Sequence, residues 1–348
     1  MNLNNIFKKV SGVALAATLA FGGFSTVANA ATGPTVTKTV GDGTQYFGGG
    51  TFNFTLGKGT VADTEYAGFN KPANNYNLVT LSSNSISVPA GTGTEGTLTV
   101  NYADPGDLTN VPTGVYRYTL TEDDIDTTAN PNLAGIAKDG STFNIDVFVV
   151  NDGNGGKEIA NIIVTKSGET GKVSDFDTNN ITNNNGFTFN NTIESNQVTV
   201  SKTITGNQAN MDDTFTFTFG IGTANKSIRY SVNGGQNWTT LENGTTTVDL
   251  GNGDSFVIDG ISNTDQLTVS EDKKDYNTTI NGTADDDGSI TTNYAGTNNG
   301  ALEFVNSRDT NVPTGLIENI APFVLAIAAA GVIFFVYFKR DKEEEQLA

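Results

Sequence analysis

The stretch Thr35-Val36-Thr37-Lys38-Thr39-Val40 recurs as Thr199-Val200-Ser201-Lys202-Thr203-Ile204, which matches it position for position in residue type. Both stretches alternate polar residues with branched apolar ones, a two-residue period that is typical of a β-strand with one face against a core. In each stretch the lysine falls on the apolar face. The sequence therefore predicts two strands that each bury one lysine.

Three further pairs of segments repeat in the same order behind these two strands. The pairs are residues 52–56 and 215–219, 118–123 and 267–272, and 187–191 and 302–306. An ordered internal repeat indicates homologous structural units. We therefore expect two homologous β domains, at residues 31–193 and 194–310, with no long linker between them.

The remaining sequence of these domains has the pattern of an all-β protein. Alternation also predicts strands at 96–100, 115–120, 142–150 and 158–165, and the chain has 40 glycines, which favour turns. We expect a turn-rich stretch over 175–186 and see no amphipathic helix between residues 31 and 310. The expected fold is a pair of tandem β-sandwiches.

The N-terminus has the features of a secretory signal peptide. Lys8 and Lys9 precede an apolar segment at 10–24, and Ala28-Asn29-Ala30 offers a small-x-small cleavage site. We therefore assign residues 1–30 to a signal peptide and expect the chain to be exported.

The C-terminal segment 311–348 combines a short motif with a membrane span. Val312, Pro313, Thr314 and Gly315 precede an uncharged apolar run at 320–338, which is long enough to cross a bilayer as a helix, and Lys339-Arg340 follow it. An ordinary membrane anchor would have the same run. The motif resembles the pilin-type sorting signal of Gram-positive sortases, which cut between Thr and Gly. An earlier copy at 110–114 lacks the apolar run and is interpreted as a loop that enters a strand.

The composition excludes several classes of function. The chain has no cysteine and no histidine, so disulfides, Ser-His-Asp and Cys-His nucleophile systems and the usual zinc sites are excluded. Its formal net charge is −19, which disfavours binding to nucleic acid. We expect no cofactor and no metal. Asp-rich turns at 123–124 and 285–287 lack calcium-loop spacing, and residues 231–238 predict a hairpin whose Trp packs locally.

Each repeat carries one lysine on its first strand, one glutamate after a middle strand and one asparagine on its last strand. The two trios are Lys38, Glu122 and Asn191, and Lys202, Glu271 and Asn306. Alternation places the lysines and asparagines on inward faces among aromatic residues, where polar groups are costly unless they are paired. For one repeat alone, snorkelling lysines or buried ion pairs would explain the pattern as well as a bond between the side chains would.

The two trios together resemble those of the immunoglobulin-like (CnaB-like), isopeptide-forming domains of streptococcal T-antigen-type major pilins. This resemblance implies an amide bond between Lys38 and Asn191 with Glu122 as catalytic acid, and another between Lys202 and Asn306 with Glu271. Burial would favour a neutral amine and a protonated carboxyl, and the acid would polarise the asparagine carbonyl and shuttle protons. Each domain would act once on itself, so the chain would not be a turnover enzyme.

The resemblance also implies a function and a location. It predicts a structural subunit of a covalently polymerised surface pilus in the cell wall of a Gram-positive bacterium, joined by sortase at Thr314 and membrane-held only as a precursor. The expected partners are sortase, other copies of the chain, minor pilins and host surface ligands. The alternative is a wall-anchored adhesin of the same fold that does not polymerise, and a surface glycosidase is a third, less favoured class.

The sequence departs from the family at the lysine that accepts the next subunit. Residues 183–186 read Asn-Asn-Asn-Gly where the family presents that lysine, and the Tyr-Pro-Lys motif of other pilins is absent. The nearest lysines are Lys172 and Lys166, of which we favour Lys172 as the acceptor.

Overall fold

The computed structural model describes residues 32–178, 186–232, 234–293 and 300–309. The predicted signal peptide, sorting motif and membrane span lie outside these ranges. Within them, no helix is both long and apolar enough to cross a bilayer. Residues 206–208 and 309 belong to a separate small unit, in which the Asn207 amide donates to Asp309 Oδ1 at 2.9 Å.

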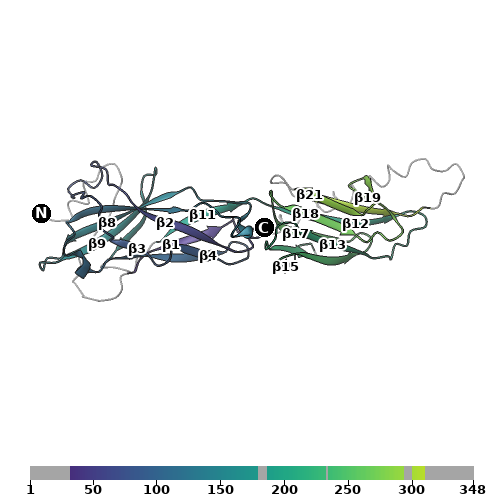
Figure 1. Ribbon diagram of the computed structural model, residues 1–348, viewed down its shortest axis with the longest axis horizontal. Helices are drawn as coiled ribbons and strands as arrows, with labels where there is room; N and C mark the ends of the chain where they lie inside the picture. The colour runs from purple at the N-terminus through teal and green to yellow at the C-terminus, as the bar shows by residue number, and fades with distance from the viewer. Residues whose placement is uncertain (1–31, 179–185, 233, 294–299, 310–348) are drawn as a thin grey trace, which may run out of the picture. The chain divides into compact units, whose positions relative to one another are not determined.

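The first part of the chain forms a five-stranded and a six-stranded sheet (Figure 1). The five-stranded order is β3 (Val79–Leu81), β5 (Glu95–Tyr102), β1 (Thr32–Val40), β11 (Phe187–Ile193) and β7 (Ile136–Ala137). The six-stranded order is β10 (Lys172–Asp177), β9 (Lys157–Lys166), β8 (Thr142–Asn151), β6 (Gly114–Glu122), β2 (Gly50–Lys58) and β4 (Ser85–Val88). Two short 3-10 helices, η2 (Pro105–Leu108) and η3 (Pro131–Leu133), lie in the connections.

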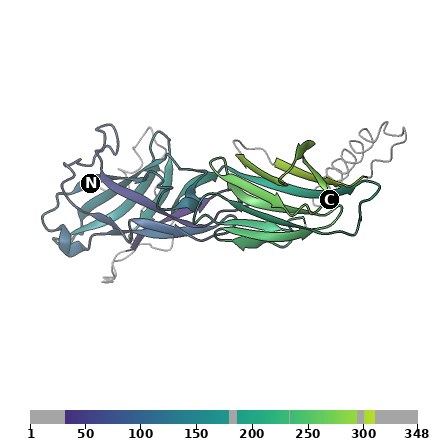
Figure 2. The same ribbon diagram turned by 45° about the vertical axis from the view of Figure 1, so that its right-hand side comes forward.

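The second part forms a seven-stranded and a four-stranded sheet, seen as two layers in Figure 2. The seven-stranded order is β15 (Thr239–Leu241), β14 (Ile228–Ser231), β17 (Ser255–Ser262), β12 (Ser195–Thr205), β22 (Gly300–Ser307), β19 (Asn277–Ile280) and β20 (Thr283–Asp285). The four-stranded order is β16 (Thr245–Leu250), β13 (Phe215–Ile221), β18 (Gln266–Glu271) and β21 (Ser289–Asn293). The fold is therefore two tandem β-sandwiches, as predicted.

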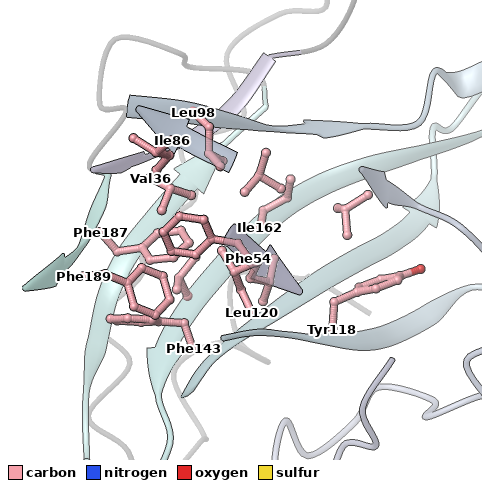
Figure 3. Close-up of a cluster of buried hydrophobic side chains, with 14 of the residues drawn as sticks. Val36, Phe54, Ile86, Leu98, Tyr118, Leu120, Phe143, Ile162, Phe187 and Phe189 are labelled. Atoms are coloured by element: carbon pink, nitrogen blue, oxygen red, sulfur yellow. The ribbon is translucent and has the colours of Figure 1, made fainter. Parts of the chain in front are cut away.

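Each sandwich has its own aromatic-rich core between its two sheets. In the first, Phe189 of β11 packs against Phe54 of β2, with ring centroids 5.1 Å apart, and against Phe143 of β8 at 4.8 Å (Figure 3). In the second, Phe217 of β13 packs against Phe304 of β22 at 5.0 Å. The two cores draw on separate residues, from Val36 to Ile193 and from Val198 to Phe304.

In both sandwiches the first and last strands lie side by side and run parallel. β1 pairs with β11, and β12 pairs with β22, in equivalent registers. The register pairs are Lys38 with Phe189 and Val40 with Asn191 in the first sandwich, and Lys202 with Phe304 and Ile204 with Asn306 in the second. The first and last strands of each sandwich are therefore direct neighbours in one sheet.

The strands predicted from alternation are confirmed, and the loop at 110–114 leads into β6 as expected. One expectation was wrong. Residues 175–177, assigned to a turn-rich stretch, lie in β10, where Phe176 is buried against the sheet while the polar residues beside it are only half-buried. Strands β3, β4, β7, β14, β15, β16, β17, β19, β20 and β21 were also not predicted. Most of these strands are too short to show a period, whereas β17 is long and contributes Phe256, Ile258 and Ile261 to the second core.

Candidate functional site

Three inward-facing side chains from three strands meet in the first sandwich. Lys38 lies on β1, Asn191 lies on the neighbouring β11, and Glu122 is the last residue of β6 in the opposite sheet. The alternation that buries Val36 and Val40 also turns Lys38 inward. The exposed fractions of Lys38, Glu122 and Asn191 are 0%, 3% and 2%.

The Glu122 carboxyl group contacts both the amine and the amide. Glu122 Oε2 lies 3.4 Å from Lys38 Nζ, and Glu122 Oε1 accepts a hydrogen bond of 2.6 Å from Asn191 Nδ2. Lys38 Nζ also donates to the backbone carbonyls of Thr39 at 3.1 Å and Phe189 at 3.4 Å. The Glu122 carboxyl group thus contacts both the Lys38 amine and the nitrogen of the Asn191 amide.

The second sandwich holds the same trio on the equivalent strands. Lys202 lies on β12, Asn306 on β22, and Glu271 is the last residue of β18. Glu271 Oε1 lies 2.7 Å from Lys202 Nζ and accepts a 2.8 Å hydrogen bond from Asn306 Nδ2. Lys202 Nζ makes no further hydrogen bond among the described residues, so its polar contact is the ion pair with Glu271.

Burial shifts the ionisation of both acid–amine pairs in the same sense. It lowers the pKa of Lys38 and of Lys202 to about 8, against the opposing effect of the neighbouring glutamates. It also raises the pKa of Glu122 and of Glu271 above the usual glutamate value. Both shifts favour the pair in which the amine is neutral and the carboxyl holds the proton.

An aromatic ring lies beneath each amine. Lys38 Nζ lies 4.8 Å from the centre of the Phe52 ring, and Lys202 Nζ lies 4.2 Å from that of Phe215. Phe52 and Phe215 occupy equivalent places, because the next inward residues, Phe54 and Phe217, pair with the two glutamates. The rings exclude water from one side of each amine and compensate part of the cost of a buried ammonium.

Each asparagine carbonyl oxygen accepts a hydrogen bond from a group that sequence analysis did not identify. The Asp139 backbone N–H donates to Asn191 Oδ1 at 2.6 Å, and the Thr278 hydroxyl donates to Asn306 Oδ1 at 2.7 Å. The glutamates lie on the nitrogen side of the amides rather than at the carbonyl oxygens, where we had expected them to act. No sequence signal marks these donors, because one is a backbone group in a connection and the other lies on an unpredicted strand.

The other predicted residues lie apart from the trios. Asn190, adjacent to Asn191, is exposed. Lys166 ends β9 and Lys172 begins β10, and they form ion pairs with Glu169 and Asp175, respectively.

The Trp-containing segment and the Asp-rich turns lie outside the trios. Residues 232 and 234–238 lie between β14 and β15, which pair as a hairpin, and the Trp238 ring packs on Arg229, with its centroid 4.2 Å from Cζ. Among the described residues, no group of three His, Cys, Asp or Glu side chains is placed to hold a metal ion.

Comparison with solved structures identifies the fold. The chain is similar to the major pilin from Streptococcus pyogenes, with 20% sequence identity and a TM-score of 0.53 over 81% of this chain and 100% of that one. A substitution mutant of the same pilin gives the same identity and coverage, with a TM-score of 0.50. The predicted likeness to streptococcal major pilins is thus confirmed at the level of the fold.

Sequence comparisons add one match, over the second sandwich. Residues 196–308 match the protein family described as "Domain of unknown function (DUF7601)". No curated protein matches the chain. The matched segment covers less than half of the chain. Its bounds correspond closely to those of the second sandwich.

Proposed function

We propose that the chain is a structural subunit of a covalently polymerised surface pilus of a Gram-positive bacterium, with each sandwich closed by a Lys–Asn isopeptide bond. The observation that carries the proposal is the trio, in which one buried carboxyl group contacts both an amine and an amide nitrogen. It occurs twice, on equivalent strands. A buried ion pair that served packing alone would not require an asparagine amide on the same carboxyl group.

In the proposed reaction, the neutral lysine Nζ attacks asparagine Cγ, and the Cγ–Nδ2 bond breaks. The glutamate carboxyl gives one proton to the departing Nδ2 and takes one from Nζ, so ammonia leaves and the glutamate ends as it began. The lowered lysine pKa and the raised glutamate pKa favour the starting state. The folded sandwich supplies the proximity of the groups, and each site reacts only once.

The mechanical consequence follows from the parallel pairing of first and last strands. A bond between β1 and β11, and another between β12 and β22, would let tension pass along the chain through covalent links. A shaft subunit needs this property because load on a pilus is transmitted through every copy. The likeness of the fold to that of a major pilin supports the same role.

Sortase would join the subunits through Thr314. Cleavage between Thr314 and Gly315 would free the chain from its membrane-held precursor, and the Thr314 carbonyl would form an amide with a lysine of another copy. Both candidate acceptors remain proposals. The side chain of Lys166 is 38% exposed, whereas that of Lys172 is only 13% exposed.

A cell extract tests the pilus assignment. Surface proteins released from the source bacterium and boiled in detergent should give a ladder of covalent multimers that react with antibody against this chain. Deletion of the sortase or substitution of Thr314→Ala should collapse the ladder to the monomer. A single wall-linked species in the wild-type strain would instead support a non-polymerising adhesin.

A further inference from the structure

The two asparagine amides are held in one orientation by their neighbours. A backbone N–H can only donate a hydrogen bond, so the atom of Asn191 that faces the Asp139 N–H must be Oδ1. Its Nδ2 then faces Glu122. In the second site Asn306 Nδ2 donates to Glu271 Oε1 and the Thr278 hydroxyl donates to Asn306 Oδ1, with all three side chains buried. This is the same orientation that the Asp139 N–H imposes on Asn191 in the equivalent first site.

This orientation separates two tasks that the glutamate had been expected to perform alone. The glutamate lies at the amide nitrogen, where it can protonate the leaving group. When an amine attacks Cγ, negative charge develops on Oδ1, and a donor already aimed at that oxygen stabilises it in a water-excluded site. The group in that position is the Thr278 hydroxyl in the second site and the Asp139 N–H in the first.

We infer that Thr278 is a catalytic residue of the second site, whose hydroxyl stabilises the oxyanion that forms on Asn306 Oδ1 as Lys202 attacks. The inference rests on the proposed function. No atom is transferred to or from Thr278, because its hydroxyl only donates a hydrogen bond while the proton exchange runs through Glu271. The Asp139 backbone N–H supplies the same stabilisation in the first site without using a side chain.

The test is the rate of bond formation in the full chain, recovered unfolded and then refolded. Intact mass would follow the loss of ammonia, and mapping of the cross-linked peptides would assign each loss to one site. Thr278→Val should slow bond formation in the second site roughly 10²- to 10³-fold, as expected when one donor to a developing oxyanion is removed. The first site of the same molecule should keep its rate.

Two variants separate catalysis from packing. Thr278→Ser keeps the hydroxyl and should restore the rate to near that of the wild type. Thr279→Val removes a hydroxyl from the adjacent residue of β19, which alternates to the other face, and should leave the rate unchanged. Thermal unfolding of the second sandwich would show that each variant folds. Should Thr278→Val prevent folding, the inference requires that Thr278→Ala, if folded, is slow and Thr278→Ser is fast.

The outcomes distinguish this inference from the proposed function. Wild-type-like bond formation in a folded Thr278→Val variant would overturn the role of Thr278 and leave the isopeptide bonds in place. Equal slowing in Thr278→Ser would also overturn it, because the hydroxyl would then not be the active group. A wild-type chain that loses no ammonia would overturn the proposed function itself, and this inference with it.

Discussion

The two buried trios lie on equivalent strands, yet their surroundings differ. In the first sandwich Lys38 Nζ lies 3.4 Å from its glutamate and also donates to two backbone carbonyls, whereas Lys202 Nζ lies 2.7 Å from its glutamate and has no such bonds among the described residues. The donor to the asparagine carbonyl is a backbone N–H in one site and a threonine hydroxyl in the other. Both sites thus place a donor at that oxygen, although the donor comes from a different kind of group in each.

The segments that follow the two glutamates also differ in charge. Glu122 is followed by Asp123, Asp124 and Asp126, which help to line a small pocket with room for about one water molecule. Glu271 is followed by Asp272, Lys273 and Lys274, and Lys274 Nζ lies 4.9 Å from the centre of the Phe215 ring. The trios lie at equivalent strand registers, whereas the connections around them differ between the two sandwiches.

Removing each glutamate is the strongest test of whether the two sites are independent. Glu122→Ala should abolish bond formation in the first site and Glu271→Ala in the second, because loss of a general acid–base typically costs ~10²–10⁴-fold. Each variant should gain the mass of one ammonia over the wild type, and the other site should still close. Glu158→Ala, a half-buried glutamate of β9 outside the trios, is the matched control and should leave the mass deficit intact.

The Glu122→Ala and Glu271→Ala variants should lose nearly equal amounts of unfolding free energy, each in the sandwich that lacks its bond. The bonds would close loops of about 150 and about 100 residues, and loop-closure entropy then assigns about 5 kcal/mol to each, since the effect grows only with the logarithm of length. In guanidinium unfolding, the midpoint should move to a lower denaturant concentration for the sandwich that lacks its bond and should stay unchanged for the other. A shift confined to Glu271→Ala would mean that only the second sandwich depends on its bond.

The pH dependence of bond formation should be similar in the two sites. The reactive pair holds one proton, on the glutamate, so the rate should fall above about pH 8 as the pair loses that proton. It should also fall in acid, below the raised pKa of Glu122 or Glu271, because the lysine then stays protonated. Refolding at a series of pH values, followed by intact mass, measures the profile. A rate that rose steadily above pH 9 would show that the glutamate proton is not used.

Asp139→Ala should have the smallest effect, and only in the first site. The backbone N–H that faces Asn191 remains, so the rate near neutral pH should stay within about threefold of the wild type, in contrast to the loss of a donor expected for Thr278→Val. The Asp139 carboxylate raises the pKa of both Lys38 and Glu122, so its removal should move the first profile to lower pH. If the pH profile of bond formation did not move in the first site, or moved equally in both sites, the result would contradict this account.

The trios could be predicted from sequence because their positions follow from simple alternation. Lys38 and Lys202 fall between apolar residues on strands with a clear two-residue period, and the repeat places Asn191 at the position of Asn306. The donors could not be predicted. Asp139 contributes a backbone group, whose direction depends on the path of a connection, and Thr278 lies on a four-residue strand in a stretch rich in Asn and Thr.

The strand β10 was missed for a related reason. Only Ser174 and Phe176 of its residues are buried, and Lys172 and Asp175 read as a polar turn although they form an ion pair on the strand. Sequence analysis therefore recovered most of the strands that build the cores. It missed several short strands and also β17, which contributes Phe256, Ile258 and Ile261 to the second core.

The intact mass of the purified chain tests the central claim most directly. Measured under denaturing conditions, it should fall below the calculated value by two ammonias, and protease digestion should yield one peptide that joins Lys38 to Asn191 and another that joins Lys202 to Asn306. A mass equal to the calculated value, with both lysines recovered in unlinked peptides, would contradict the account and leave the two trios as buried ion pairs that serve packing alone.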